Sequence, residues 1–308
     1  MILYLAPMAG VCDSAFRQLC RDFGADVTVS EMISAKAVCF GDKKTEALAA
    51  FRDAERPILI QIFGSEPEIM AKAAKILWER FSPDGIDINM GCPVPKITKN
   101  GEGSALMKDP ALVYEIVARV RDAFGGPLSV KIRAGRTASN LNAPEIALAA
   151  KRAGADAICV HGRTAAQMYS PPVNREIIRE VKAALGEDYP VIANGDITDA
   201  QSALETARIT GCDRLMIGRG ALGRPWIFGE IKAALAGEAY TPPKDPREVI
   251  LRHLELCLET KPEAVAVREM RKHAAAYIKG FRGASVLRER INRAETADEL
   301  RSLIENAY

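Results

Sequence analysis

The stretch LMIGRGALGRPW, residues 215–226, decides between two fold classes. Its glycines, Gly218, Gly220 and Gly223, have the GxGxxG spacing with which a doubly wound sheet binds the pyrophosphate of a dinucleotide. In that fold the motif opens the first strand–helix unit, and an acidic residue ends a second strand about 20 residues later. Here the motif follows the last strand-like run, and only a helix-like segment and a proline-rich break come after it. The stretch therefore argues against a dinucleotide-binding fold.

Short apolar runs alternate with helix-like segments along the first three-quarters of the chain. The runs lie at 2–6, 27–32, 57–63, 85–89, 128–132, 157–161, 190–194 and 214–218. Segments between them, such as EPEIMAKAAKILWERF and APEIALAAKRAGA, carry apolar residues at helical spacing. This alternation predicts parallel strands joined by crossover helices. Eight repeats fit a closed (β/α)8 TIM barrel, whereas a doubly wound open sheet usually has fewer strands.

A second domain is expected after the barrel. The proline-rich break TPPKDP, residues 241–246, suggests a linker, and the segments after it are spaced like helices. We therefore expect a catalytic α/β barrel over 1–240 and a small all-α helical domain over 241–308.

The composition is that of an ordinary globular protein. The 308 residues are 48% hydrophobic and 27% charged, and their formal net charge of +2 gives no overall signal for nucleic-acid binding. The seven cysteines are scattered and form no CxxC or Cys/His cluster, so we expect neither disulfides nor a metal site. The chain opens MILYLAPMAG, without a basic segment ahead of an apolar one, and has no uninterrupted apolar run of roughly 18 residues. We expect a cytoplasmic protein without a membrane segment.

One concentrated basic region stands out in residues 265–293, which carry eight Lys or Arg against two Glu. A basic run on a helix is most often a solvated face. Tyr277 and Phe281 are interleaved with basic residues here, which also suits binding of a nucleic-acid backbone with occasional base stacking. The residues that we expect to contact such a partner are Arg271, Lys272, Lys279 and Arg282.

Polar side chains gather where the predicted strands end. In TIM barrels the catalytic residues lie at the carboxyl ends of the strands. The residues found there are Gln61, Asn89, Cys92, Lys131, His161 and Asn194. Ordinary strand–helix turns explain the glycines of these segments but not this set of polar residues.

The last two strand ends predict a phosphate site. In barrels the loops after the seventh and eighth strands commonly bind a phosphate through backbone N–H groups, and glycines permit that close approach. ANGDI and IGRGAL then form one site, in which Gly195, Gly218 and Arg219 hold a single phosphate.

A flat ligand held by that phosphate would lie over the barrel mouth. Lys131 supplies a positive charge beside a ring that becomes anionic on reduction, and Gln61 and Asn194 offer amides to a pyrimidine-like edge. This pattern favours FMN over a sugar phosphate. The alternative for Lys131 is a Schiff-base lysine, as in barrel aldolases.

Cys92 lies between Gly91 and Pro93 on the loop after the fourth strand, close to the expected ligand. A thiol there is suited to act as a nucleophile or as a proton donor. As a nucleophile it would need a base, and His161 alone of the three histidines lies at this end of the barrel. Hydride reduction of an activated C=C bond leaves a carbanion that needs a proton, and a loop cysteine suits that role.

Seven motifs together resemble the tRNA-dihydrouridine synthases, in order and over essentially the whole chain. They are APMAG, DINMGCP, KIR, HGRT, ANGDI, GRGALGRPWIF and RKHAAAYIKG. The resemblance implies an FMN-bearing barrel, a helical tRNA-binding domain, NADPH as electron donor and reduction of uridine to 5,6-dihydrouridine.

The resemblance also assigns roles to individual residues. Those expected to line or contact the flavin are Pro7, Met8, Ala9, Gln61, Lys131 and His161. Those expected at its ribityl phosphate end are Asn194, Gly195, Asp196, Gly218 and Arg219. Cys92 would deliver a proton to C5 after hydride passes from flavin N5 to C6, and Asn89 and Arg133 would position the ring or the substrate.

Two alternatives stand beside this hypothesis. A flavin barrel of the dihydroorotate or dihydropyrimidine dehydrogenase type would act on a free pyrimidine, but a small substrate does not need a basic helical domain. A non-catalytic RNA-binding protein would not need Cys92, Lys131 or the phosphate loops. We expect a monomer that binds one tRNA.

Overall fold

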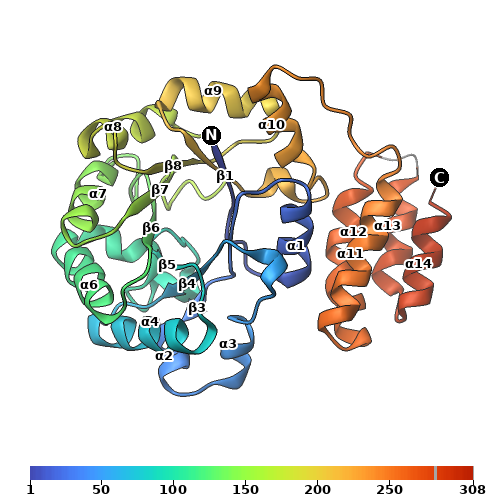
Figure 1. Ribbon diagram of the computed structural model, residues 1–308, viewed down its shortest axis with the longest axis horizontal. Coiled ribbons are helices and arrows are strands. Elements are labelled where there is room, and N and C mark those ends of the chain that lie inside the picture. The colour runs from blue at the N-terminus through green and yellow to red at the C-terminus, as the bar shows by residue number, and fades with distance from the viewer. Residues whose placement is uncertain (281–282, 308) are drawn as a thin grey trace.

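The computed structural model describes residues 1–280 and 283–307, and its larger part is a closed barrel of parallel strands (Figure 1). The barrel strands are β1 (Ile2–Leu5), β2 (Val27–Val29), β4 (Ile58–Phe63), β5 (Gly85–Asn89), β6 (Leu128–Arg133), β7 (Ala157–His161), β8 (Val191–Asn194) and β9 (Arg214–Ile217). They pair in the order β2-β1-β9-β8-β7-β6-β5-β4, and the pairing of β2 with β4 closes the ring. The predicted TIM barrel is confirmed.

The second strand differs from its expected range of 27–32. β2 ends at Val29, and a two-residue strand, β3 (Ile33–Ser34), pairs with the last residues of β4. Between them the Ser30 hydroxyl accepts a hydrogen bond from the Gln61 N–H at 3.0 Å. This early break in the strand places Met32 at the cavity described below.

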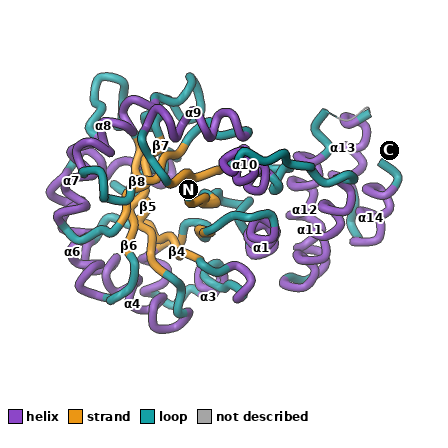
Figure 2. The backbone as a smooth tube through the Cα atoms, turned by 45° about the horizontal axis from the view of Figure 1, so that its top comes forward, coloured by secondary structure: helices purple, strands orange, loops and turns teal. Residues whose placement is uncertain are grey.

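Helices surround the strands, as Figure 2 shows with the strands inside a ring of helices. They are α1 (Ser14–Asp22), α2 (Ala35–Cys39), α3 (Lys43–Ala47), α4 (Pro67–Phe81), α5 (Pro95–Thr98), α6 (Pro110–Ala123), α7 (Ala143–Arg152), α8 (Arg175–Leu185), α9 (Ala200–Thr210) and α10 (Ile227–Ala236). Short 3-10 turns are η1 (Asp53–Glu55), η2 (Gly103–Lys108) and η3 (Arg219–Ala221). The helix α4 shows why these segments fold as they do: it starts at a proline, which suits a first helical turn, and buries Met70, Ala73 and Leu77 on one face. None of the described helices is both long and apolar enough to cross a membrane.

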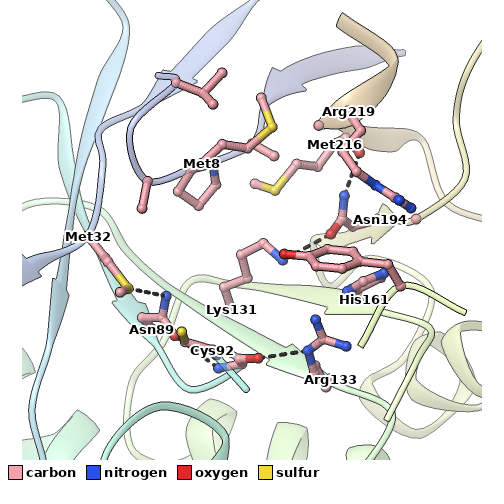
Figure 3. Close-up of a pocket in the computed structure, with 18 of the residues that line it drawn as sticks. Met8, Met32, Asn89, Cys92, Lys131, Arg133, His161, Asn194, Met216 and Arg219 are labelled. Carbon is pink, nitrogen blue, oxygen red and sulfur yellow. Dashed lines mark hydrogen bonds between the residues drawn. The ribbon is translucent and has the colours of Figure 1, made fainter. Parts of the chain in front are cut away.

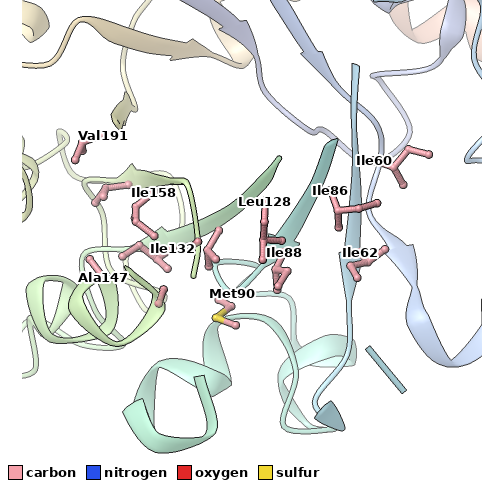
Figure 4. Packing of buried hydrophobic residues seen from close by; sticks show 14 of the residues in the cluster. Ile60, Ile62, Ile86, Ile88, Met90, Leu128, Ile132, Ala147, Ile158 and Val191 are labelled. Carbon is pink, nitrogen blue, oxygen red and sulfur yellow. The ribbon is translucent and has the colours of Figure 1, made fainter. Parts of the chain in front are cut away.

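Side chains alternate between two sides of each barrel strand. Ile86 and Ile88 of β5 face outward and pack in the core between strands and helices (Figure 4). Their neighbours Asp87 and Asn89 therefore face the barrel interior. The same alternation turns Gln61 of β4 and Lys131 of β6 inward. The polar groups at the carboxyl ends of the strands thus converge inside the ring.

After α10, the described residues form four helices that lie beside α1 and α10 (Figure 1). They are α11 (Pro246–Thr260), α12 (Glu263–Tyr277), α13 (Ala284–Arg293) and α14 (Ala297–Glu305). Their shared core includes Leu254, Met270 and Leu300, and it also takes in Ala15 and Leu19 of α1. The bundle therefore packs on the barrel through a common hydrophobic core.

Two buried histidines and a half-buried ion pair meet at this junction. Asp13 accepts from the Phe16 N–H at 2.9 Å, which caps α1, and forms an ion pair with Lys261. The rings of His253 and His273 lie 4.4 Å apart, and burial lowers the pKa of both, that of His273 to about 4. One nitrogen of each ring and a carboxylate oxygen of Asp13 lie within 4.8 Å of one another. The Lys261 ammonium already neutralises that carboxylate.

Tyr277 belongs to the same buried junction. Its side chain is buried, and its hydroxyl lies 3.3 Å from Nδ1 of His253. The prediction that Tyr277 stacks on a base is therefore wrong, because α12 turns this ring toward the barrel. Phe281 lies outside the described residues.

Two glycines of the stretch 215–226 allow backbones to pack closely. A Cβ at Gly220 would lie 2.2 Å from the carbonyl oxygen of Ile197, so the loops after β8 and β9 touch there. Gly223 has a φ of +74°, and a Cβ there would lie 2.6 Å from the carbonyl group of Ala276 in α12. The GxGxxG spacing thus serves loop packing and contact with the helical bundle.

We predict that Gly223→Ala destabilises the protein more than Gly211→Ala. Gly211 has a similar φ of +69° but open space around it, so alanine there costs only backbone strain, about 1 kcal/mol. At Gly223 the methyl group also collides with the α12 backbone, which costs about 2 kcal/mol more. Urea unfolding of both variants measures the difference. Equal losses would show that the contact with α12 relaxes freely.

Candidate active site at the barrel mouth

A cavity of about 720 Å³ opens at the carboxyl ends of the strands. Every barrel residue predicted to hold the flavin or the substrate lines it. These are Pro7, Met8, Ala9, Gln61, Asn89, Cys92, Lys131, Arg133, His161, Asn194, Gly195, Asp196, Gly218 and Arg219. The fold thus brings the predicted residues together, while their individual roles stay predictions.

Lys131 occupies the centre of the cavity wall (Figure 3). Its ammonium donates to Oδ1 of Asn194 at 2.9 Å, and Nδ2 of Asn194 donates to the Met216 carbonyl at 2.8 Å. Burial lowers the pKa of Lys131, and the nearby Arg133 guanidinium lowers it further. The amide of Asn194 is thereby oriented, with its oxygen toward the lysine.

Cys92 is half-buried on a loop that is held from both sides. The side-chain oxygen of Asn89 accepts from the N–H groups of Gly91 at 3.1 Å and Cys92 at 2.9 Å. On the other side the Cys92 carbonyl accepts from the Ser104 N–H at 3.0 Å. Gly103 has a φ of +60°, and a Cβ there would lie 2.7 Å from that carbonyl oxygen. The glycine-rich segment 101–104 therefore packs against the cysteine.

Arg133 links the Cys92 loop to the loop after β7. Its guanidinium donates to the carbonyls of Gly91 at 2.8 Å, Thr164 at 2.9 Å and Met168 at 3.0 Å. The side chain lines the cavity, as predicted, but three of its hydrogen bonds go to backbone. Direct contact between Arg133 and a substrate stays a prediction.

The predicted phosphate end holds a network of one carboxylate and two arginines. Asp196 accepts from Arg163 at 2.6 Å and from the Val173 N–H at 2.9 Å, and it pairs with Arg219 at 3.5 Å. Gly195 has a φ of +121° and lies against the His161 ring. A carboxylate repels a phosphate, so this geometry suits Asp196 to orient the two arginines. Gly195 is suited to donate its backbone N–H group to the phosphate.

His161 is a neutral imidazole. Its burial lowers the pKa to about 2, and the positive charges of Lys131, Arg133, Arg163 and Arg219 act in the same direction. The ring nitrogen Nε2 lies 3.5 Å from the Arg163 guanidinium. Such a concentration of positive charge around a neutral ring favours an anionic ligand.

Several residues near the cavity had no predicted role, among them Arg163, Tyr169 and Met32. Arg163 lies within the quoted motif HGRT, and its guanidinium is buried. Tyr169 is exposed on the irregular loop after β7, and the Arg219 guanidinium stacks 4.7 Å from its ring centre. Met32 follows the early end of β2. The motif was the one signal available for Arg163, whereas nothing in the local pattern marks Tyr169 or Met32.

The predicted RNA contacts of the helical domain lie in different settings. Arg271 donates to the Ala294 carbonyl at the end of α13, whereas Lys272 donates to the Gly10 carbonyl at 3.1 Å, next to the cavity residues 7–9. Lys279 is exposed, and Arg282 lies outside the described residues. The fold thus brings Lys272 toward the barrel mouth and uses Arg271 to hold α13.

Fold and cavity together define a (β/α)8-barrel protein. Its ligand site lies at the barrel mouth and is surrounded by positively charged side chains. The profile of the family described as dihydrouridine synthase (Dus) matches residues 4–308. The chain therefore belongs to the dihydrouridine synthase family.

Individual relatives match nearly the whole of this chain. The tRNA-dihydrouridine synthase B of Xanthomonas axonopodis pv. citri is 42% identical over 301 residues, which cover 96% of this chain and 89% of that protein. The tRNA-dihydrouridine synthase B of Vibrio cholerae is 38% identical over 310 residues, covering 99% and 95%. A probable tRNA-dihydrouridine synthase of Mycobacterium tuberculosis is 38% identical over 314 residues, covering 98% and 80%.

More distant solved structures share the barrel fold. An (S)-mandelate dehydrogenase mutant superposes with a TM-score of 0.51 at 18% identity, covering 77% of this chain and 74% of that one. The Amycolatopsis orientalis BexX/CysO complex gives a TM-score of 0.50 at 20% identity, covering 76% and 88%. At these identities the likeness concerns the fold alone.

We predict that His161 makes the protein less stable in acid. Its pKa is about 2 in the folded state and near 6.5 when unfolded, so the unfolded chain binds more protons between these values. Stability therefore falls as the pH drops below 6.5. Urea unfolding measures the free energy of unfolding at pH 7 and at pH 5. The decrease in this free energy between the two pH values is expected to be about 2 kcal/mol smaller in His161→Gln than in the wild-type protein. His253 and His273 are present in both proteins, so identical losses would mean that His161 is not kept neutral.

Proposed function

We propose that this protein is a tRNA-dihydrouridine synthase, which reduces the C5=C6 bond of uridine in tRNA with electrons from NADPH passed through FMN. The observation that carries the proposal is the family match over residues 4–308, which spans both the barrel and the helical bundle. A dehydrogenase of free pyrimidines would account for the barrel but not for the bundle. The relatives named as tRNA-dihydrouridine synthases support tRNA as the substrate.

The cavity suits FMN in size and charge. Its volume of about 720 Å³ falls within the usual range of ligand pockets, and its glycine-containing loops and arginines match a phosphate group. Gly195, Gly218 and Arg219 would hold the phosphate, with Asp196 and Arg163 orienting Arg219. Pro7, Met8 and Ala9 would lie along the ring system, while Gln61 and Asn194 offer their amides and His161 a neutral imidazole to its polar edge.

Lys131 would supply the positive charge beside the reduced ring. Its lowered pKa also suits a Schiff-base lysine, so the pKa does not separate the two roles. The family match favours the flavin role, because uridine reduction requires no imine.

The chemistry that reduced FMN would supply, when held by these residues, is a hydride for C6 of the uracil. This leaves an electron pair on C5, next to the C4 carbonyl, and Cys92 donates its thiol proton to that carbon. The Cys92 thiolate then recovers a proton from solvent. Asn89 positions the loop that carries the thiol, through its hydrogen bonds with the N–H groups of Gly91 and Cys92.

The helical region, residues 241–308, would bind the tRNA. A uracil inside folded RNA reaches the barrel mouth only when it is turned out of its stack, so the RNA needs a second point of attachment. Exposed basic side chains on the bundle support this role, among them Arg268, Lys279, Arg288 and Arg290. Lys272, between the bundle and the mouth, would lie near the path of the base.

The test is a nucleoside mass analysis of tRNA that lacks dihydrouridine, after incubation with the purified protein and NADPH. A gain of two hydrogens on uridine is expected. Protein that carries NADPH-reducible FMN and leaves the tRNA unchanged would overturn tRNA as the substrate. The same assay with free uracil and orotate then tests the pyrimidine alternative.

In this assay we predict that Cys92→Ala keeps its yellow flavin and loses turnover by about a hundredfold or more, because protonation rather than cofactor binding is removed. Cys39→Ala is the matched control, since Cys39 is also half-buried but lies on α2, outside the cavity. A colourless Cys92→Ala protein would contradict the role, because it would make the thiol a structural or flavin-binding group.

We also predict that tRNA affinity falls with rising salt and that Lys279→Ala reduces the slope of log K against log salt by about 1. Lys75→Ala is the control, because Lys75 is 59% exposed on the barrel helix α4 and is paired with Glu79. Filter binding at several salt concentrations measures both slopes. Equal slopes in all three proteins would exclude a phosphate contact at Lys279.

A further inference from the structure

Beneath the cavity lies a buried carboxylate for which the proposed mechanism has no role. Asp87 is inward-facing on β5, two residues before Asn89, and its side chain is buried. One carboxylate oxygen accepts from Nε2 of Gln61 at 2.6 Å, and the other accepts from the Ser129 hydroxyl. The pKa of Asp87 is raised, because burial outweighs the two hydrogen bonds and the nearby Lys131 ammonium, which lower it.

The carboxylate is the first member of a chain of hydrogen bonds that ends at Cys92. Gln61 uses its NH2 group on Asp87, and its oxygen accepts from Nδ2 of Asn89 at 2.8 Å. Asn89 in turn presents its oxygen to the N–H groups of Gly91 and Cys92. Each amide therefore donates to its neighbour on the Asp87 side of the chain and accepts from its neighbour on the Cys92 side.

Only one orientation of the two amides satisfies this chain. An ionised carboxylate accepts hydrogen bonds and donates none, so Asp87 requires the NH2 group of Gln61. The backbone N–H groups at the other end require the oxygen of Asn89. If Gln61 turned over, its NH2 group would face the NH2 group of Asn89, and two buried donors would lack acceptors.

We propose that Asp87 is a positioning residue, which fixes the orientation of the Gln61 and Asn89 amides and through them the loop that carries Cys92. Both amides line the cavity, so the same orientation also decides which edges they present to a ligand. Asp87 itself acts from below the cavity. Its effect on the reaction passes through the position of the thiol.

The first test is the alkylation rate of Cys92 by iodoacetamide in the full-length protein, followed by peptide mass spectrometry. Asp87→Leu keeps a similar side-chain size and removes the acceptor. Because the loop loses its fixed hydrogen bond to Asn89, alkylation is expected to become about threefold faster or more. Ser129→Ala is the matched control, since it removes the other partner of Asp87 and leaves the Gln61 contact in place; its rate is expected to match wild type.

Asp87→Asn is the conservative variant. Its amide oxygen can still accept from Gln61 while its NH2 group donates to the Ser129 hydroxyl oxygen, so it is expected to restore the wild-type rate. If Asp87→Leu does not fold, Asp87→Val removes the same acceptor with a side chain that suits a strand, and the expected result is the same. A wild-type alkylation rate in a folded Leu or Val variant would overturn the proposal.

The second test uses turnover and rests on the proposed function. Asp87→Leu is expected to lower kcat about tenfold or more while leaving the KM for tRNA nearly unchanged, because the thiol is misplaced and the RNA surface is not. A higher KM with unchanged kcat would contradict a positioning role. Alkylation needs neither flavin nor tRNA. Its rate therefore tests the positioning role of Asp87 even if the proposed reaction is wrong.

Discussion

The structure depends on the alternation of side chains along eight strands that close into a ring. Outward residues such as Ile86 and Ile88 pack against helices, and each inward neighbour then has no route to solvent except along the barrel axis. In an open sheet the same polar residues would spread over a face. Closure through the β2–β4 pair gathers them at one mouth, where they must satisfy one another. The hydrogen bonds that join Asp87, Gln61 and Asn89, and the bond from Lys131 to Asn194, meet that requirement.

The parts of the fold and site that follow from alternation were predictable from the sequence. Apolar runs bounded by glycines locate the strands, and parallel strands place Gln61, Lys131 and His161 at the same end. Met32 was not predictable in this way, because it depends on β2 ending at Val29. Tyr169 lies in an irregular loop with no period, and its position depends on stacking against Arg219, which is distant in sequence.

The helical region shows a different limit of sequence reasoning. A basic run at helical spacing predicts helices, but the face that a helix buries is decided by its partner, here Leu19 and its neighbours on α1. Tyr277 was therefore expected at the surface and lies in the junction. In the same packing, Arg271 donates a hydrogen bond to the Ala294 carbonyl at the end of α13. The packing also brings Asp13 close to His253 and His273, which lie far from it in the chain.

Gly223 gives the proposed reaction a geometric consequence. Its backbone touches α12 directly, and the bundle shares a core with α1, so the bundle and the barrel mouth are held at a set separation. An RNA docked on the bundle would then lie at a fixed distance from the cavity. The nucleotide that enters the mouth would be chosen by its reach from the docking point, and the cavity would need to recognise only a uracil.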